Sequence, residues 1–354
     1  MTTAASPDPI RVGVIGAGSN TKLYHIPNLQ KHAGVTVEVV CNRTVESAQA
    51  VAKEFGIPKA VADWTSVIMD PTLDAIVIGT WPNMHKPLVL AALQAGKHVL
   101  CEARMALNWG EALEMLEESR RRPPQVAQIV PSPLTLRYDA AIQETIKSGV
   151  LGQLTYITVR GVSGWPEANG APMTFRQDAE LSGDNILFLG IMYEALARWV
   201  GHASSVMAMG QTVVKWRTDP ATSALRGVEV PDHLDVLARM ACGAQAHLLL
   251  SAVAGGSDRP ALEFWLHGSQ GALHLDLTAG ALTLSRPDVE GGAPQPVTLA
   301  HPGAWRVEEE FVGAIRGKER VRLTDFPTAA RYMEFTTAVA RSLRSGHSVG
   351  MPLV

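Results

Sequence analysis

The sequence has no apolar stretch long enough to cross a bilayer and no large excess of charge of either sign. Its 354 residues include 31 Lys and Arg against 34 Asp and Glu, a formal net charge of −3. A membrane-spanning helix needs about 18 or more consecutive apolar residues, and nucleic-acid-binding domains carry basic surfaces. We therefore expect neither a membrane protein nor a nucleic-acid-binding protein. The N-terminal residues lack a basic segment followed by an apolar one, so we expect no secretory signal and a cytoplasmic location.

Cysteine is scarce, with only Cys41, Cys101 and Cys242 and no C-x-x-C pair. An odd, widely spaced set argues against both a disulfide framework and a structural zinc site. No spacing of His, Asp and Glu suggests another metal site. Hydrophobic residues make up 46% of the chain and charged residues 18%. This composition is that of a globular protein, and the length predicts two domains.

The first third of the chain alternates short apolar strands with helices. Strands without polar alternation, separated by helices, predict a parallel sheet that is buried on both faces. Residues 1–130 are therefore predicted to form a doubly wound Rossmann domain. The expected strands are 10–15, 36–41, 74–80, 97–102 and 125–130, and the expected helices are 45–55, 85–95 and 108–122.

After residue 130 the pattern changes to strands in which apolar and polar residues alternate. Such strands predict a mainly antiparallel sheet with one buried and one open face, so residues 131–354 are predicted to form an α+β domain. The expected strands are 154–161, 236–243, 244–253, 262–269 and 271–277. The expected helices are 136–148, 184–199, 307–316 and 328–345, and 281–305 is expected to be a surface loop. The last helix is a candidate to pack back on the Rossmann domain.

Gly16 and Gly18 follow the first strand and precede a helix. Glycines at this point allow a tight turn and bring backbone N–H groups to a pyrophosphate at the helix N-terminus. The third glycine of the usual fingerprint is missing, because Ser19, Asn20 and Thr21 follow. Either the helix lies farther from the strand or the loop holds an extra residue. The three polar side chains are candidates to hydrogen-bond the phosphates.

Asn42 and Arg43 end the second strand, where an acidic residue would bind the 2′-hydroxyl of the adenosine ribose. Asn42 carries no charge that would repel a 2′-phosphate, and the Arg43 guanidinium can pair with one. This favours NADP over NAD as the cofactor. The alternative is that Arg43 stacks on adenine, which serves either cofactor.

Five segments along nearly the whole chain resemble the Gfo/Idh/MocA family of glucose–fructose oxidoreductase and inositol dehydrogenase relatives. They are VGVIGAG (12–18), DAIVIGT (74–80) with His85 five residues later, AALQAGKHVLCE (91–102), KSGVLGQLTYITV (147–159) and RYMEFTTAVARSLRSGHSV (331–349). The resemblance implies hydride transfer between NAD(P) and a sugar, polyol or related hydroxy compound. It also implies that Thr80, His85 and Glu102 line the cofactor site, and that the open sheet face forms a homodimer or homotetramer.

The sequence departs from this family where its members carry out the chemistry. The usual E-K-P reads Glu102-Ala103-Arg104, and alanine neither donates nor accepts a proton. The family's D-x-G-x-H-x-x-D helix has Phe188, Met192 and Ala195 at its three ionisable positions. The chain therefore resembles a divergent member of this family that lacks the usual lysine and the catalytic histidine.

Trp81 stands in the Thr-Pro-Asn segment that usually follows the fourth strand. It is expected near the nicotinamide, either as a stacking surface or as an ordinary packed side chain.

Three residues are candidates to handle the proton in place of the missing groups: Arg104, Tyr193 and Glu194. A buried Glu or Tyr serves as acid or base when its pKa moves toward neutrality. The alternative for Glu194 is an ion pair with Arg198, four residues on. Trp165 and Arg176 offer an apolar face and a polar edge to a carbohydrate-like substrate.

Three functions follow from these patterns. The first is an NAD(P)-dependent oxidoreductase of sugars or polyols with a non-standard acid/base. The second is a lyase or glycoside-cleaving enzyme that keeps a tightly bound NAD(P) and oxidises its substrate transiently. The third is a family member that binds the nucleotide without catalysis.

Overall fold

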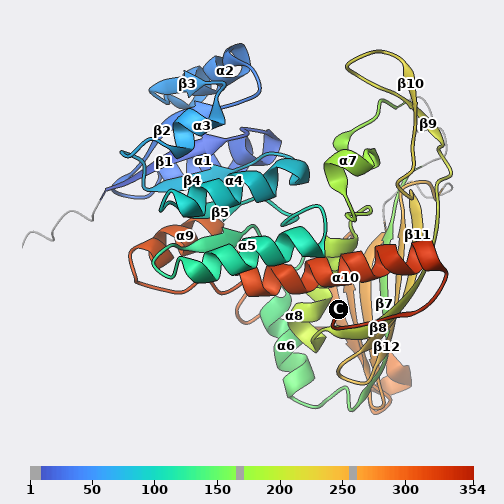
Figure 1. Cartoon of the computed structure of the whole chain (residues 1–354). Helices are drawn as coiled ribbons and strands as arrows, with labels where there is room; N and C mark the ends of the chain where they lie inside the picture. Colours follow the sequence, from blue (N-terminus) through green and yellow to red (C-terminus); the bar gives the residue numbers. More distant parts are fainter. Residues whose placement is uncertain (1–8, 165–170, 255–260) are drawn as a thin grey trace, which may run out of the picture. The chain divides into compact units, whose positions relative to one another are not determined.

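The computed structural model describes residues 9–164, 171–254 and 261–354 (Figure 1). The chain forms two compact units. The first contains Met1–Pro131 and Arg306–Ala330, and the second contains Ser132–Trp305 and Arg331–Val354. The first unit is therefore built from two segments that are far apart in the sequence.

The first unit is built on a six-stranded sheet in the order β3-β2-β1-β4-β5-β6, in which every pair of neighbours is parallel. This confirms the predicted Rossmann fold. Runs such as IRVGVI form strands because β-branched side chains suit a pleated, buried surface. The strands are β1 (Ile10–Ile15), β2 (Val35–Cys41), β3 (Lys59–Val61), β4 (Ala75–Ile78), β5 (His98–Cys101) and β6 (Ala127–Ile129).

Helices connect these strands, and their ends follow from local side-chain chemistry. The Thr44 hydroxyl accepts a hydrogen bond from the Ser47 N–H at the start of α2, and Gly56 ends that helix at a φ of 66°. Asn108, the first residue of the helix expected over 108–122, caps α5 by accepting from the Glu111 N–H. The helical elements are the π-helical turn η1 (Thr21–His25), α1 (Ile26–Gln30), α2 (Val45–Phe55), α3 (Trp64–Ile68), α4 (Pro82–Gln94), α5 (Trp109–Arg121) and α9 (Val307–Ile315).

The segment Arg306–Ala330 is held in the first unit by helix packing and by hydrogen bonds. Helix α9 lies against α1, and the Ile129 N–H of β6 donates to the Thr324 carbonyl. The long helix α10 (Phe326–Ser345) begins in this segment and continues into residues of the second unit.

The second unit contains a nine-stranded sheet in the order β16-β15-β14-β13-β7-β12-β11-β8-β17. Its pairs are antiparallel except for the central pair of β7 and β12, which is parallel. The predicted mainly antiparallel domain is confirmed. The strands are β7 (Leu154–Val162), β8 (Ala203–Gln211), β11 (His233–Met240), β12 (Gln245–Ser251), β13 (Ala261–Gly268), β14 (Ala272–Asp276), β15 (Ala281–Ser285), β16 (Gln295–Pro296) and β17 (Val349–Gly350).

The remaining elements of this unit are short apart from two helices. They are α6 (Asp139–Lys147), η3 (Phe175–Gln177), α7 (Ala179–Ser182), α8 (Leu189–Val200), η4 (Glu290–Gly292) and a separate antiparallel pair, β9 (Trp216–Thr218) with β10 (Leu225–Gly227).

One face of the nine-stranded sheet forms the core of the second unit. Leu248 and Phe264 on this face are fully buried, and Trp199 of α8 meets the Phe264 ring edge-on with the centroids 4.9 Å apart. The opposite face leaves Met207 and Leu237 about half exposed. The predicted alternation of buried and open positions is thus present.

Two expectations about this unit are wrong. The helix expected over 184–199 begins at Leu189, because Leu187 has a φ of 47° and the Asp184 carboxylate instead accepts from the Thr337 hydroxyl at 2.7 Å. The expected surface loop 281–305 contains β15 and β16. Leu282 points into the core, so the first part of this segment gains more by joining the sheet than by remaining a loop.

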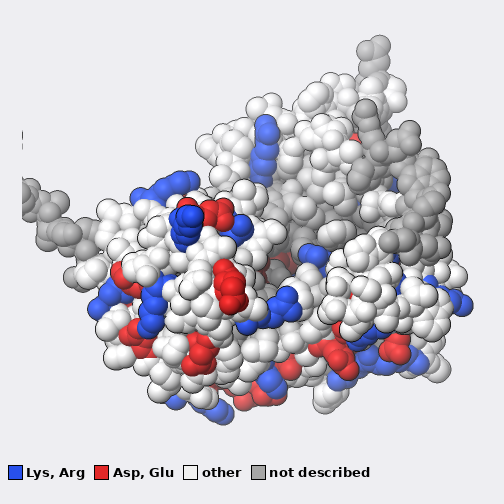
Figure 2. Space-filling view, turned by 90° about the horizontal axis from the view of Figure 1, so that it is seen from above, with Lys and Arg blue, Asp and Glu red and all other residues white. Residues whose placement is uncertain are grey.

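Basic and acidic side chains are scattered and intermixed over the face drawn in Figure 2, without a continuous patch of one sign. None of the helices in the described ranges combines the length and the apolar character that crossing a membrane requires.

Candidate functional site

The order of the six-stranded sheet changes direction between β1 and β4. In a doubly wound fold, ligands bind outside the carboxyl ends of the strands at such a switch point. All the predicted cofactor residues lie in segments that follow β1, β2, β4 or β5, so the fold brings them to one edge of the sheet. These residues are Gly16, Gly18, Ser19, Asn20, Thr21, Asn42, Arg43, Thr80, Trp81, His85 and Glu102.

The glycine loop has a different steric requirement at each of its two glycines. Gly16 has a φ of 86°, and a Cβ there would lie 2.7 Å from the Thr80 backbone nitrogen. A Cβ on Gly18 would meet only the Gly79 carbonyl, at 3.7 Å, and both Gly18 and Ser19 are exposed. Gly16 is thus required by the fold, whereas Gly18 leaves an open cradle that suits a pyrophosphate.

Thr21 stands where the third fingerprint glycine would be, and it is buried against Gly79. A Cβ on Gly79 would lie 2.1 Å from the Thr21 Oγ1, which itself donates to the Gly16 carbonyl at 3.3 Å. The close approach of helix and strand therefore depends on a glycine after β4 instead of one in the helix. Residues 21–25 form a π-helical turn, the kind of turn that absorbs an additional residue.

Asn42 supports the loop from the end of β2. Its Oδ1 accepts from the Ala17 N–H at 2.8 Å, and its Nδ2 donates to the Ser47 hydroxyl at 2.9 Å. Arg43 next to it is exposed, and its guanidinium lies 5.0 Å from the centre of the Trp81 ring. This cation–π contact joins the ends of β2 and β4 across the switch point.

Two polar atoms at the turn after β4 are buried without a hydrogen-bond partner in the described part of the chain: Thr80 Oγ1 and Asn83 Oδ1. Such atoms in a native fold call for a ligand, a water molecule or an ion. Together with the open cradle at Gly18, they show that the residues present fit a dinucleotide. Among the described residues, no group of His, Cys, Asp and Glu could hold a metal ion.

His85 braces the two turns that follow β4 and β5. It is fully buried, and its ring nitrogens contact the Arg104 carbonyl at 2.9 Å and the Thr80 carbonyl at 3.0 Å. Burial lowers the pKa of His85. The contacts fix Thr80 and Arg104 from behind the site.

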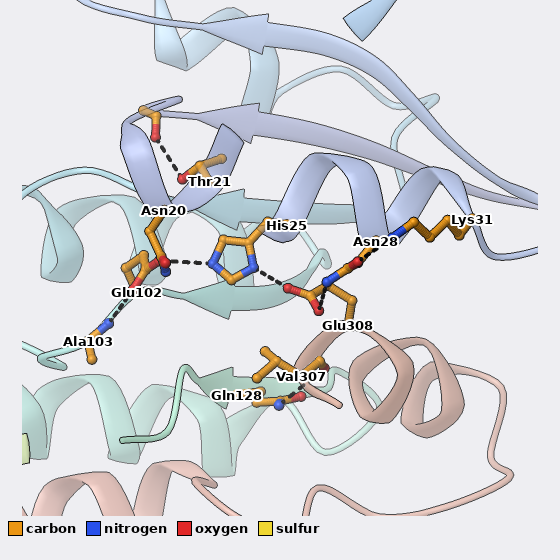
Figure 3. A network of polar contacts seen from close by, with 11 residues as sticks. Asn20, Thr21, His25, Asn28, Lys31, Glu102, Ala103, Gln128, Val307 and Glu308 are labelled. Atoms are coloured by element: carbon orange, nitrogen blue, oxygen red, sulfur yellow. Dashed lines mark hydrogen bonds and ion pairs between the residues drawn. The ribbon is translucent and has the colours of Figure 1, made fainter. Parts of the chain in front are cut away.

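Figure 3 shows a polar network behind the glycine loop, centred on His25. The Nε2 of His25 contacts Glu102 Oε1 at 2.9 Å, and its Nδ1 contacts Glu308 Oε1 at 2.5 Å. Asn20 donates from its side-chain amide to Glu102, whose other oxygen accepts from the Ala103 N–H at 3.1 Å. Two carboxylates accept only from N–H groups, so the ring holds a proton on both nitrogens.

The protonation of this network follows from burial opposed by charge. Burial of His25 lowers its pKa, but the hydrogen bonds and negative charges of Glu102 and Glu308 outweigh this and raise the pKa to about 9. For Glu102, burial raises the pKa, and the contacts with His25 and Asn20 bring it below its ordinary value. At neutral pH the group is an imidazolium between two carboxylates.

The predicted catalytic residues of the second unit are held by contacts with their own unit. The Tyr193 ring stacks on Phe335 at 3.5 Å, and its hydroxyl accepts from the Ala203 N–H at 2.9 Å. Burial raises the pKa of Tyr193. Glu194 accepts from the Ser132 N–H at 2.9 Å and pairs with Arg198 at 3.4 Å. These contacts favour a structural interpretation of both side chains, including the ion pair foreseen as the alternative for Glu194.

Four further residues after position 131 bear on the predictions. Met192, which the sequence resemblance aligns with the histidine of the family, is fully buried, whereas Phe188 is 43% exposed. Arg176 lies with its guanidinium 4.5 Å from the centre of the Phe175 ring, and burial lowers its pKa. Trp165 lies outside the described residues.

Sequence reasoning missed His25, Glu308 and Gly79. His25 has a weak signal, since it lies in the helix directly after the glycine loop. Glu308 opens the predicted helix 307–316 within three consecutive glutamates, a pattern that reads as a solvated helix start. Its burial depends on a contact with a residue 283 positions away, which no local pattern reveals.

A doubly wound domain with a dinucleotide site, followed by a mainly antiparallel domain, defines the class of the protein. The sequence model of the Gfo/Idh/MocA family, described as an oxidoreductase family with an NAD-binding Rossmann fold, matches residues 10–128. The description of the C-terminal domain of the same family matches residues 140–274. The chain belongs to the Gfo/Idh/MocA family, as the sequence motifs predicted.

Two curated relatives and one solved structure illustrate the similarity. An uncharacterized oxidoreductase of Rhizobium meliloti is 28% identical over 221 residues, which covers 62% of this chain and 64% of that protein. The levoglucosan dehydrogenase of Pseudarthrobacter phenanthrenivorans is 25% identical over 310 residues, 78% of this chain and 76% of that protein. A structure of levoglucosan dehydrogenase in complex with NADH and levoglucosan matches with a TM-score of 0.84 at 21% identity, covering 98% of this chain and 100% of that chain.

We expect Gly18→Ala and Gly79→Ala to separate cofactor binding from folding. A Cβ at Gly18 meets no close protein atom but fills the cradle, so it should weaken cofactor binding by at least about tenfold at unchanged stability. A Cβ at Gly79 collides with Thr21 and should lower the free energy of unfolding by about 1–3 kcal/mol. Urea denaturation and cofactor titration of both variants measure this. Equal loss of stability in both would contradict the assignment.

The raised pKa of His25 predicts that the free energy of unfolding decreases as the pH becomes alkaline. Its stabilising contribution is complete below pH 6.5 and is lost as the pH rises through about 9. The difference in free energy of unfolding between the wild type and His25→Gln should therefore shrink by about 3 kcal/mol between pH 6 and 10. Urea denaturation at several pH values measures it, with His32→Gln as the matched control. A difference that stays constant with pH would refute the imidazolium.

Tyr193→Phe and Glu194→Gln test the structural interpretation of these two side chains. Tyr193→Phe removes the partner of the buried Ala203 N–H. Glu194→Gln removes the charge that pairs with Arg198 and places an NH2 group in the position of one oxygen that accepts from the Ser132 N–H. Each variant should therefore lower the free energy of unfolding by about 1–3 kcal/mol. Cofactor affinity should stay as in the wild type. Denaturation and cofactor titration measure the two effects, and a variant of unchanged stability that loses turnover would instead identify a catalytic group.

Proposed function

We propose that this protein is an NAD(P)-dependent oxidoreductase that transfers hydride to or from a sugar, polyol or related hydroxy compound. The observation that carries the proposal is the open cradle at Gly18, beside the buried, unsatisfied Thr80 Oγ1, at the switch point of a Rossmann sheet. The name of the levoglucosan dehydrogenase relative supports a carbohydrate-like substrate. The nicotinamide supplies the hydride chemistry when bound, and the chain's residues position the reactants and handle one proton.

The proposal includes a preference for NADP over NAD. The exposed Arg43 directly precedes the N-terminal end of α2, a helix of 11 residues whose dipole favours negative charge there. Stacking on Trp81 holds the guanidinium at this end of the sheet. Asn42 carries no charge that would repel a 2′-phosphate at that position. Its side-chain amide is hydrogen-bonded to the Ala17 N–H and the Ser47 hydroxyl.

The proton step is proposed to proceed without the lysine and histidine of the family. Arg104 is 7% exposed, and its carbonyl is fixed by His85. Arg104, Tyr193 and Glu194 are the candidates from the sequence, and the contacts of the last two argue that Arg104 is the first to test. An arginine stabilises an alkoxide or binds a carboxylate rather than donating a proton.

The second unit is proposed to supply substrate contacts and the oligomer interface. Arg176 remains the candidate for polar edges of a carbohydrate, together with Trp165. The open sheet face, with Met207 at 51% and Leu237 at 46% exposure, is proposed to pair with a second copy in a homodimer or homotetramer.

Titration with NADPH and NADH tests the cofactor proposal, with energy transfer from the tryptophans to the nicotinamide as the signal. We expect tighter binding of NADPH. Arg43→Ala should weaken NADPH binding by about 10–100-fold, the size of one charge-assisted contact, and leave NADH binding unchanged. Arg121→Ala, an exposed arginine on α5, is the matched control.

This titration, together with a turnover assay, separates the candidate functions. Turnover on a panel of sugars and polyols with a change in nicotinamide absorbance supports the oxidoreductase. Turnover without net change supports transient oxidation by a lyase or glycoside-cleaving enzyme. No binding of reduced or oxidised cofactor, after any co-purified nucleotide has been stripped, would refute the proposal.

A further inference from the structure

The buried His25 network joins four places that are distant in the sequence. Glu308 comes from α9, His25 ends the π-helical turn, Glu102 directly follows β5, and Asn20 belongs to the glycine loop (Figure 3). His25 has no exposed surface and the Glu308 side chain is 2% exposed, whereas the Glu102 side chain retains 14% exposure. Of the three ionisable members of the network, Glu102 is therefore the one that a ligand can reach.

Glu102 lies in the half of the sheet that receives the nicotinamide nucleotide in a doubly wound fold. It directly precedes Ala103, which stands where the family has its lysine. Its carboxylate already accepts from Asn20, His25 and the Ala103 N–H. Three donors fix the orientation of this carboxylate and keep it ionised.

Glu308 is held in turn from the other side. Its Oε2 accepts from the Asn28 amide at 3.1 Å, and the Asn28 Oδ1 accepts from Lys31 at 3.0 Å. Glu310, two residues further along α9, accepts from the Arg322 N–H and faces the Gln128 amide. Among the described residues, the charges of Glu102 and Glu308 raise the pKa of the imidazole.

A neutral imidazole has one N–H and cannot serve both carboxylates. One carboxylate would then face a ring lone pair at 2.5 or 2.9 Å and would have to move or take up a proton. Since Glu102 is tied to Asn20, such a movement reaches the glycine loop. The state of His25 is therefore coupled to the geometry of the cofactor site.

We propose that His25 and Glu308 are positioning residues that hold the Glu102 carboxylate and, through Asn20, the glycine loop in the geometry that binds the nicotinamide cofactor. The inference rests on the proposed function and extends it to residues that touch no substrate. Helix α9, which returns to the first unit after most of the second, thereby contributes to cofactor binding without contacting the cofactor.

The experiment measures the NADPH dissociation constant from pH 6.5 to 10, together with the His25 ring nitrogen signals by ¹⁵N NMR. In the wild type, NADPH affinity should fall by about tenfold as the imidazolium loses its proton, the effect of one charge-assisted hydrogen bond. Glu308→Gln removes one of the two carboxylates, so the NMR titration and the fall in affinity should both move to lower pH. Glu308→Gln preserves the shape of the side chain. The pH series on the wild type tests the same link without any substitution that could impair folding.

His25→Gln should bind NADPH with the weaker affinity at every pH and should show no alkaline step. The control His32→Gln should show the same step as the wild type. A Glu308→Gln variant whose His25 titration moves while the affinity profile does not would overturn the positioning role alone. A wild type that binds no nicotinamide cofactor at any pH would overturn the proposed function and this role with it.

Discussion

The first unit depends on an imidazolium that is buried between two carboxylates. His25 bridges Glu102 and Glu308, and burying these carboxylates without a charged partner would be costly. The pairing joins residues 77 and 283 positions apart from His25, so it forms only when the Rossmann sheet and the returning segment Arg306–Ala330 are both in place. One charged contact thereby links the completion of the fold to the edge where the cofactor residues gather.

The cofactor edge replaces several familiar residues and keeps the geometry by other means. The third glycine is absent, but Thr21 fits because Gly79 has no side chain. The acidic residue after β2 is absent, and Asn42 instead braces the glycine loop while Arg43 stacks on Trp81. These compensations retain the cradle at Gly18. They are consistent with a site that still binds a dinucleotide and recognises its ribose differently.

Helix α8 is a packing element of the second unit. Met192 and Tyr193 of α8 are buried, and Trp199 of the same helix contacts Phe264 of the sheet. Glu194 serves Ser132 and Arg198 at the start of the domain. Helix α8 is thus tied into the core of the second unit by these contacts.

The sequence by itself determined the two-domain α/β class, most strands of both sheets, the cap of α5 and the glycine cradle. These features depend on local periodicity and on residue types with fixed backbone preferences. Tertiary structure alone decided the return of α9 to the first unit, the late start of α8, the strand at Ala281–Ser285 and the burial of Glu308. Each of these depends on a partner far away in the chain: His25 for Glu308, Thr337 for Asp184, and β14 for β15. A local pattern records the preference of a segment, but the free energy of burying a charge or adding a strand depends on the partner that the folded chain supplies.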